Sequence, residues 1–422
     1  MAESFSAALK VERMHRTAYP TPQTRPHRHC PVHRVPLDDL TRLTHYARTL
    51  HIPPEQLWFK LPQQRDQAAT QVPATAELPW PDGPAEERKD AMERRRLLQW
   101  AATSLGVGAL GLSAETVRQL LDLVLTGEHH RTSEDWQVTC ADHLHALRTR
   151  PPAQVRDDLL VDLLAVAHQL QLTPSGRDAT ELRRVTSMLA MIHANALTRL
   201  GEHGPAIRWC RTARDAADAS ADLDLRLLVR ASEAGLGLYG QRDPHTVLTL
   251  TQQAQRIAGP RPSAGLAHIT ATQAKALSLL GRHQEAHQAL NTLITLSETD
   301  LGGQGPSFWT RSQVHFAESW VHAASGDEAA TSRARDNVAK LTSDYQYQIN
   351  IQLHQALCTI ASGGIDQGAQ QAATVLSNLP PAYHSNMITQ TGRMVLRTVP
   401  LDRQQRPAVA ELREMLAIAP TP

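Results

Sequence analysis

Aromatic residues and cysteines are scarce in this chain, and each shortage limits what it can be. Phe, Trp and Tyr make up only 4% of its 422 residues, so the core has to come from Leu, Ala, Val and Ile, which favours packed helices. No CxxC pair occurs, and the four cysteines lie far apart, at Cys30, Cys140, Cys210 and Cys358. We therefore expect no disulfide framework, and a reducing cytoplasm fits the pattern.

The chain also has no large excess of positive or negative charge. The formal net charge is +1, which argues against polyanion binding by the whole chain but leaves room for a local basic patch. No Walker loop, GxGxxG, GxSxG or HExxH motif is present, so neither an enzyme nor a cofactor is expected.

Long hydrophobic runs are absent as well. Residues 1–16 contain charges and no continuous apolar stretch, unlike a signal peptide. The apolar run that follows Arg96 has about 16 residues and includes Gln99, Thr103 and Ser104, whereas a membrane span needs roughly 20 apolar residues. We expect this segment, 92–112, to be a helix packed on the following domain, with no membrane partner.

Composition divides the chain into three zones. Residues 1–62 are basic, and residues 63–91 are rich in Pro, Ala and acidic residues without a hydrophobic period, which predicts a disordered linker. From 92 to 422, apolar residues recur at helical spacing, as in DLLVDLLAVAHQLQL (158–172). Alternating β-branched runs do not occur, and the predicted fold class is all-α.

A repeat is present within the helical zone. Five segments close one helix on a glycine and open another within a few residues, and Gly suits the left-handed turn after a helix. The spacings between these glycines are 39, 41, 45 and 38 residues; they are Gly201, Gly240, Gly281, Gly326 and Gly364. Self-similarity at this period predicts a stacked helical-hairpin solenoid of five or more hairpins.

These turns resemble those of the tetratricopeptide repeat family. A Gly followed five residues later by Ala occurs in LGEHGPA (200–206) and LGRHQEA (280–286), and a small residue stands seven before the turn Gly at Ala194, Ala274 and Ser319. The resemblance covers about residues 180–380. The period exceeds the family's usual 34 residues, and the second and fifth repeats fit better when shifted by one residue.

A second resemblance is found near the N-terminus. DDLTRLTHYARTLHIPPEQLWFKLP (38–62) is similar to the closing helices of the helix-turn-helix domain in Cro/C1-type (XRE) regulators, and residues 5–15 match a first helix. The order of this module (1–62), a linker and a repeat domain (92–422) resembles an actinobacterial regulator architecture. The resemblance implies a cytoplasmic, DNA-binding transcriptional regulator whose repeat domain senses a peptide or small ligand or mediates dimerisation.

The segment between those two matches, residues 15–36, does not fit a DNA-reading helix, so residues 1–62 are expected to be a degenerate helix-turn-helix module. Five prolines interrupt it, and each interior proline costs a helix about 3 kcal/mol. They are Pro20, Pro22, Pro26, Pro31 and Pro36. A shifted reading frame in the gene would explain intact flanks around a segment of this kind.

Other interpretations of the same segment stay open. Arg25, Arg28 and Arg34 are candidates for a basic arm that contacts DNA phosphates without sequence preference. A zinc site has the right ligand types but no recognised spacing, and a solvated basic loop is the plainest alternative. The residues that suggested zinc are His27, His29, Cys30 and His33.

The helical zone supplies two further sets of candidates. Cys140 and His143 share a helical face and His145 is close in sequence, but no fourth ligand is evident beside them, so we expect an ordinary helix and no metal site. When each turn Gly is placed at the tetratricopeptide turn position, two inward rows result that could bind a peptide. The rows are Asn195, Lys275 and Trp320, and Arg230, Phe316 and His354. Such side chains are equally compatible with ordinary packing.

Two functions follow. The first is a transcriptional regulator that binds DNA through residues 1–62 and a ligand, a peptide or a second copy of the chain through its helical domain. The second is an adaptor that binds a partner protein and has no DNA activity.

Overall fold

The structure is a computed structural model that describes residues 131–418, apart from 174, 260 and 299–308. The expected helix-turn-helix module (1–62), the linker (63–91) and the apolar run (92–112) lie outside the described residues. So do Arg25, Arg28 and Arg34 and the residues weighed as zinc ligands.

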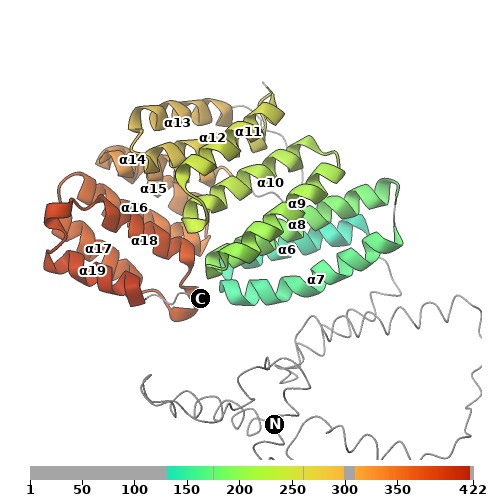
Figure 1. The fold of residues 1–422 in the computed structure, drawn as a ribbon, viewed down its shortest axis with the longest axis horizontal. Helices are drawn as coiled ribbons and strands as arrows, with labels where there is room; N and C mark the ends of the chain where they lie inside the picture. The colour runs from blue at the N-terminus through green and yellow to red at the C-terminus, as the bar shows by residue number, and fades with distance from the viewer. Residues whose placement is uncertain (1–130, 174, 260, 299–308, 419–422) are drawn as a thin grey trace, which may run out of the picture. The chain divides into compact units, whose positions relative to one another are not determined.

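The described residues form fourteen α-helices and no strand, which confirms the all-α prediction for this part of the chain (Figure 1). In chain order, the helices are α6 (Ser133–Thr149), α7 (Pro152–Leu172), α8 (Arg177–Leu200), α9 (His203–Ala219), α10 (Leu223–Leu236), α11 (Pro244–Ala258), α12 (Ala264–Leu279), α13 (His283–Ser297), α14 (Ser312–Ser325), α15 (Glu328–Leu341), α16 (Tyr345–Ala361), α17 (Ile365–Ser377), α18 (Asn386–Thr398) and α19 (Pro407–Ile418).

These helices are arranged as successive hairpins in two layers. The even-numbered helices α6 to α18 pack on one another in chain order and form the inner layer. Of the odd-numbered helices, α9, α11, α13, α15 and α17 each pack on the even-numbered helix before and the one after them (Figure 1). Each hairpin therefore buries its apolar face against its neighbours.

The inner layer also closes on itself. Helix α18 packs against α8 and against the π-helical turn η3 (Gly237–Gln241) that follows α10. The Asn386 amide nitrogen donates to the backbone oxygen of Tyr239 at 2.9 Å and to that of Thr198 at 3.3 Å. One hydrophobic cluster consequently extends from Trp136 in α6 to Leu416 in α19.

The turn glycines follow the prediction at four of five positions. Gly201, Gly240, Gly281 and Gly326 have φ values of 80°, 88°, 70° and 76°, in the left-handed region. The prediction is wrong by one residue at the fifth turn, where Gly363 has φ 99° and Gly364 caps the start of α17. Residues with a Cβ rarely adopt this left-handed backbone conformation, so glycine is favoured there.

The one-residue shift at the fifth turn also moves its close-packing position. Ala206 and Ala286, five residues after their turn glycines, are fully buried. Five residues after Gly363 comes Gly368, where an added Cβ would lie 2.5 Å from Ile360 Cγ1 and 2.7 Å from the Ala356 oxygen. Here α17 approaches α16 too closely for any side chain.

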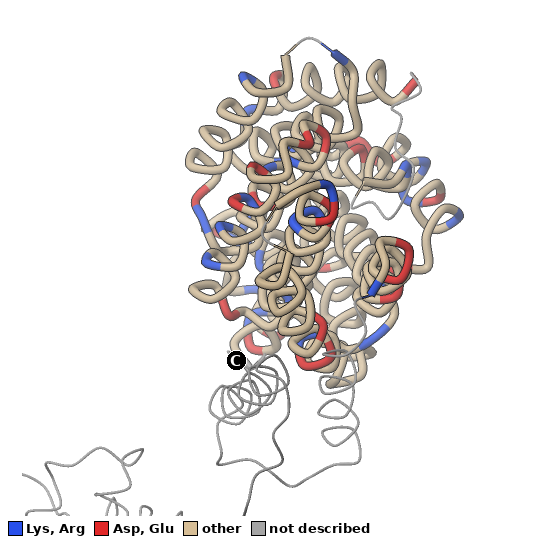
Figure 2. Tube along the Cα trace, turned by 90° about the vertical axis from the view of Figure 1, so that its right-hand side faces the viewer, with Lys and Arg blue, Asp and Glu red and all other residues tan. Residues whose placement is uncertain are grey.

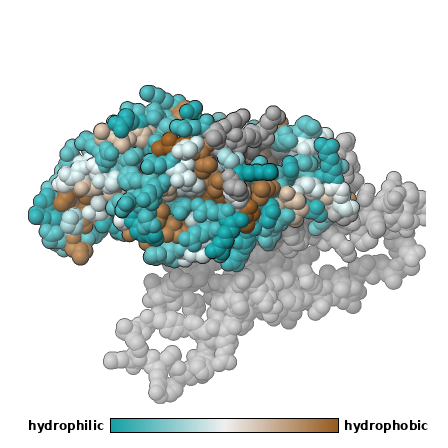
Figure 3. All heavy atoms as spheres, turned by 90° about the horizontal axis from the view of Figure 1, so that it is seen from above, coloured by the Kyte–Doolittle hydropathy of each residue, from teal (hydrophilic) through white to brown (hydrophobic). Residues whose placement is uncertain are grey.

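The described surface has mixed polarity. Lys and Arg are interspersed with Asp and Glu along the helices, without a large area of one sign (Figure 2). The face seen from above is mostly hydrophilic, with apolar residues in small patches (Figure 3). Among the described helices, none combines the length and apolar character that crossing a membrane requires.

Candidate ligand-binding cavity

A cavity of about 110 Å³ lies among the helices of the inner layer. Every even-numbered helix from α6 to α18 contributes at least one lining residue, and η3 contributes Tyr239. Because the lining comes from seven hairpins, the cavity depends on the closed arrangement of the layer and not on any single repeat.

The lining carries more positive than negative charge. Its cations are Arg148, Arg199 and Lys275, and its acid is Asp344. Three positive charges and one negative charge leave +2, with histidine neutral. A low-dielectric cavity of this sign favours an anionic occupant.

Asp344 and Arg199 bind each other and their surroundings. Arg199 Nη2 lies 3.7 Å from Asp344 Oδ2, its Nη1 donates to the Leu147 oxygen at 2.5 Å, and its Nε donates to Asn195 Oδ1 at 3.0 Å. The other Asp344 oxygen accepts the backbone N–H of Gln346 at 2.9 Å, which caps α16. Burial raises the pKa of Asp344, while Arg199 opposes that rise. Both groups are therefore engaged within the protein.

Lys275 differs from Arg199 in having no acidic partner among the described residues. Its ammonium lies 5.8 Å from the ring centres of Phe316 and of Trp320, within the range of cation–π attraction. Burial lowers the pKa of Lys275 to about 8. The described part of the chain thus places a cation in the cavity wall with aromatic rings, and no carboxylate, beside it.

Aromatic side chains surround that lysine. Phe316 stacks on Tyr347 with ring centres 4.4 Å apart, and both line the cavity. Behind them, Trp320 lies edge-on to Tyr239 at 6.0 Å and to His354 at 5.5 Å. Burial lowers the pKa of His354 to about 3, so this ring is neutral at pH 7.

Several buried polar atoms here lack a hydrogen-bond partner within the described part of the chain. Gln346 is 1% exposed; its carbonyl oxygen accepts from Ser385 at 2.6 Å, whereas its amide nitrogen is unpartnered. His268, which also lines the cavity, has an unpartnered Nδ1. Behind the lining, the same holds for Trp320 Nε1 and His354 Nε2. Buried polar groups ordinarily have partners, so the Gln346 and His268 atoms in the cavity wall are available to a ligand.

The structure brings together five of the six predicted groove residues. Asn195, Lys275 and Phe316 line the cavity, and Trp320 and His354 form the layer behind it. Whether they bind a ligand stays a prediction.

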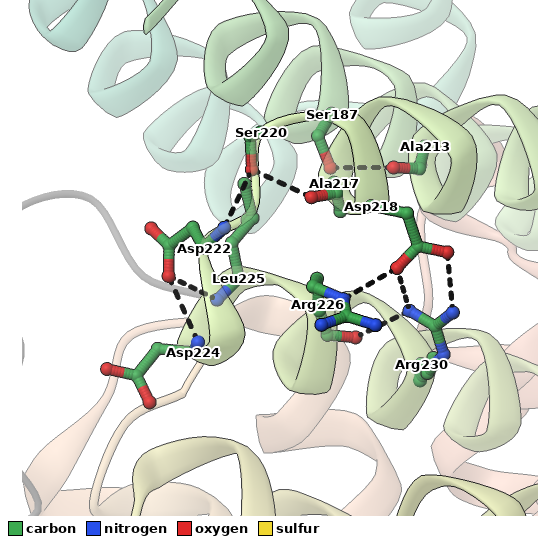
Figure 4. Close-up of polar contacts among 10 residues, drawn as sticks. All are labelled: Ser187, Ala213, Ala217, Asp218, Ser220, Asp222, Asp224, Leu225, Arg226 and Arg230. Atoms are coloured by element: carbon green, nitrogen blue, oxygen red, sulfur yellow. Dashed lines mark hydrogen bonds and ion pairs between the residues drawn. The ribbon is translucent and has the colours of Figure 1, made fainter. Parts of the chain in front are cut away.

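Arg230 is the exception, because it points to a different neighbour. Its guanidinium donates to both carboxylate oxygens of Asp218, at 3.0 and 2.7 Å, and Arg226 shares that carboxylate (Figure 4). Asp218 belongs to α9, so Arg230 joins two helices and does not line the cavity. At this turn the N–H of Arg242, two residues after Gly240, donates to the Gly237 oxygen, whereas Arg282, one residue after Gly281, donates to the Leu277 oxygen. The register of α10 relative to its glycine is thus shifted by one residue, which turns a helix by about 100°.

The Cys140 segment has a partner that the sequence did not reveal. His143 Nε2 lies 2.7 Å from Asp162 of α7, which also accepts from Arg131 at 2.5 Å. Burial raises the pKa of Cys140 to about 12, so its thiol is unreactive at neutral pH. Among the described residues no group of His, Cys, Asp and Glu side chains could hold a metal.

Sequence reasoning missed much of the cavity lining. Arg148, Arg199, His268 and Gln346 occur within helices of otherwise apolar or mixed pattern, and Asp344 reads as an ordinary helix cap. The only available signal was a polar residue at an apolar position of the helical period, which also describes many structural residues.

Comparison with protein-family models, with curated proteins and with solved structures finds no match to this chain.

Proposed function

We propose that residues 92–422 form a ligand-sensing domain, and that the chain is a transcriptional regulator whose output module is the N-terminal segment 1–62. The observation that carries the sensing role is the cavity, with a buried lysine that lacks an acidic partner among the described residues. The regulator role is supported by the likeness of residues 38–62 to Cro/C1-type domains, and the hairpin arrangement supports a tetratricopeptide-like solenoid.

The cavity favours a compact ligand over an extended peptide. An open superhelical groove would accept a long chain, but here α18 packs back onto α8 and η3. Asn195, which could otherwise bind a peptide backbone, gives its carbonyl oxygen to Arg199. Asn195 thus holds the Arg199 guanidinium in place.

Native mass spectrometry of the full chain, purified without denaturation, tests the sensing role. We expect a species heavier than the bare chain by the mass of one small molecule, and its loss from a variant with a filled cavity, Gly235→Leu. Gly235 lines the cavity, and a Cβ added there lies 3.8 Å from His268 of the lining and 3.4 Å from Thr272. A helical circular dichroism spectrum equal to that of wild type shows that the variant is folded. Finding only bare chain, with no stabilisation by any member of a metabolite library, would remove the sensing role.

The regulator role has its own test. A gel shift with the DNA upstream of the chain's own gene, at two salt concentrations, separates specific from electrostatic binding. The regulator role requires retention of this DNA over a scrambled sequence at the higher salt, even though five prolines interrupt residues 15–36. Retention only at low salt and without sequence preference would leave a helical ligand-binding protein with no operator.

A further inference from the structure

We propose that the cavity binds a small monocarboxylate with a short apolar body, held by its carboxylate on the Lys275 ammonium. This inference rests on the proposed sensing role and names the chemical class of its ligand.

The negative charge of the ligand is inferred from which charged side chains of the lining already have partners. All three nitrogens of Arg199 face protein acceptors, and both oxygens of Asp344 are engaged. The Lys275 ammonium instead lies 5.8 Å from the ring centres of Phe316 and Trp320. A buried charge without a counter-ion is unfavourable, so an incoming carboxylate gains the full interaction.

The same comparison of paired and unpaired side chains indicates a ligand with one negative charge. Of the three lining cations, Arg199 is paired with Asp344, and Arg148 also interacts within the protein and acts on Asp344. Among the described residues, this leaves the Lys275 ammonium to compensate one ligand carboxylate. A second negative charge on the ligand would face Arg199, whose donors are already committed, and Asp344, which would repel it. A dicarboxylate therefore binds less well than a monocarboxylate.

The apolar body of the ligand is inferred from the apolar side chains that line the cavity. Phe316 and Tyr347 present stacked rings, and the remaining apolar lining comes from helices α6, α10 and α18. These apolar residues are Leu144, Leu147, Leu236 and Met387. A short apolar body packs against these side chains, and a polar group on the ligand is accommodated only beside the polar part of the wall, such as Gln346.

The volume of the cavity favours a small ligand. A cavity of about 110 Å³ is somewhat smaller than the roughly 150 Å³ that encloses one benzene molecule in a protein core. Short-chain acids fit this space. The unpartnered amide nitrogen of Gln346 offers a neutral donor for a ligand oxygen in the same cavity.

Titration calorimetry of the full chain at pH 7 tests the inference, with butyrate as the probe. Butyramide has the same shape without the charge, succinate carries a second carboxylate, and inorganic phosphate lacks the apolar body. We expect butyrate to bind most tightly of the four. We expect Lys275→Met to weaken it by about 10- to 100-fold, the effect of losing one charged hydrogen bond. Lys340→Met, at an exposed lysine of α15, is the matched control and leaves binding unchanged.

Three results would overturn the inference: equal binding of butyramide, undiminished binding by Lys275→Met, or no binding of butyrate. None of them removes the sensing role, because a small molecule of another class detected on the purified chain would still establish it.

Discussion

The Arg199 guanidinium of α8 lies 3.7 Å from the Asp344 carboxylate at the start of α16, and both side chains are almost fully buried. This pair joins an early hairpin to a late one at the edge of the cavity. It therefore links α8 to the start of α16 across the inner layer.

Removing one member of that pair leaves the other as an isolated buried charge. We expect Arg199→Met to lower the free energy of unfolding by about 3 to 5 kcal/mol. Arg406 forms an exposed pair with Asp366 at 2.5 Å, and Arg406→Met should cost at most about 1 kcal/mol. Urea denaturation measures both variants. Equal losses would show that the buried pair has no special role.

Asn386 makes a second contact across the closure. Its amide donates to backbone oxygens of Tyr239 and Thr198, so Asn386→Ala should lose about 1 to 3 kcal/mol. Hydrogen exchange should show α18 less protected in this variant. Asn291→Ala, at an exposed position of α13, is the control. Indistinguishable protection of α18 in the two variants would argue that closure does not depend on Asn386.

Gly368 tests how closely the hairpin layers approach. An added Cβ would meet Ile360 and the Ala356 oxygen at less than 3 Å, so Gly368→Ala should destabilise by about 1 to 3 kcal/mol. At Gly204 the nearest atom to an added Cβ is the flexible Arg208 tip at 3.6 Å. Gly204→Ala should therefore be neutral or stabilising, by up to about 1 kcal/mol. A neutral Gly368→Ala would refute the close approach.

Acid should destabilise the fold through His354. Burial lowers the pKa of His354 to about 3, with Lys275 and Arg335 adding to the effect, and Ser319 Oγ lies 3.0 Å from its Nδ1. Its ordinary pKa is about 6.5. Between these values the unfolded chain binds a proton that the folded chain does not, so stability falls as the pH falls from about 6.5 towards 3.

Replacing that histidine should flatten the pH dependence. We expect His354→Gln to reduce the slope by about 1.4 kcal/mol per pH unit, the value for one proton. His145→Gln, at an exposed position of α6, is the control, and chemical denaturation at several pH values measures the slopes. An unchanged slope for His354→Gln would mean that this ring is already charged in the folded chain.

The sequence predicts the local parts of this fold better than its closure. The helical period and the turn glycines depend on neighbouring residues, so the helices around Gly201 and Gly281 are where they were expected. Gly364 was placed one residue late because either of two adjacent glycines could take the left-handed turn.

The cavity could be predicted only in part. Asn195 and Lys275 share a position six residues before their turn glycine, and that periodicity identified both. Met387 and Arg148 reach the same cavity from hairpins at opposite ends of the described chain. No local pattern connects residues so far apart in sequence, and the one-residue shift at the turn of Gly240 made the predicted position of Arg230 wrong.

The unfolding temperature of wild type and Lys275→Met, each with and without butyrate, tests the central claim most directly. An unpaired buried charge opposes folding, so the variant should be more stable than wild type without ligand, and butyrate should stabilise wild type alone. A variant that is less stable than wild type and gains equally from butyrate would contradict the claim that Lys275 is kept for a ligand.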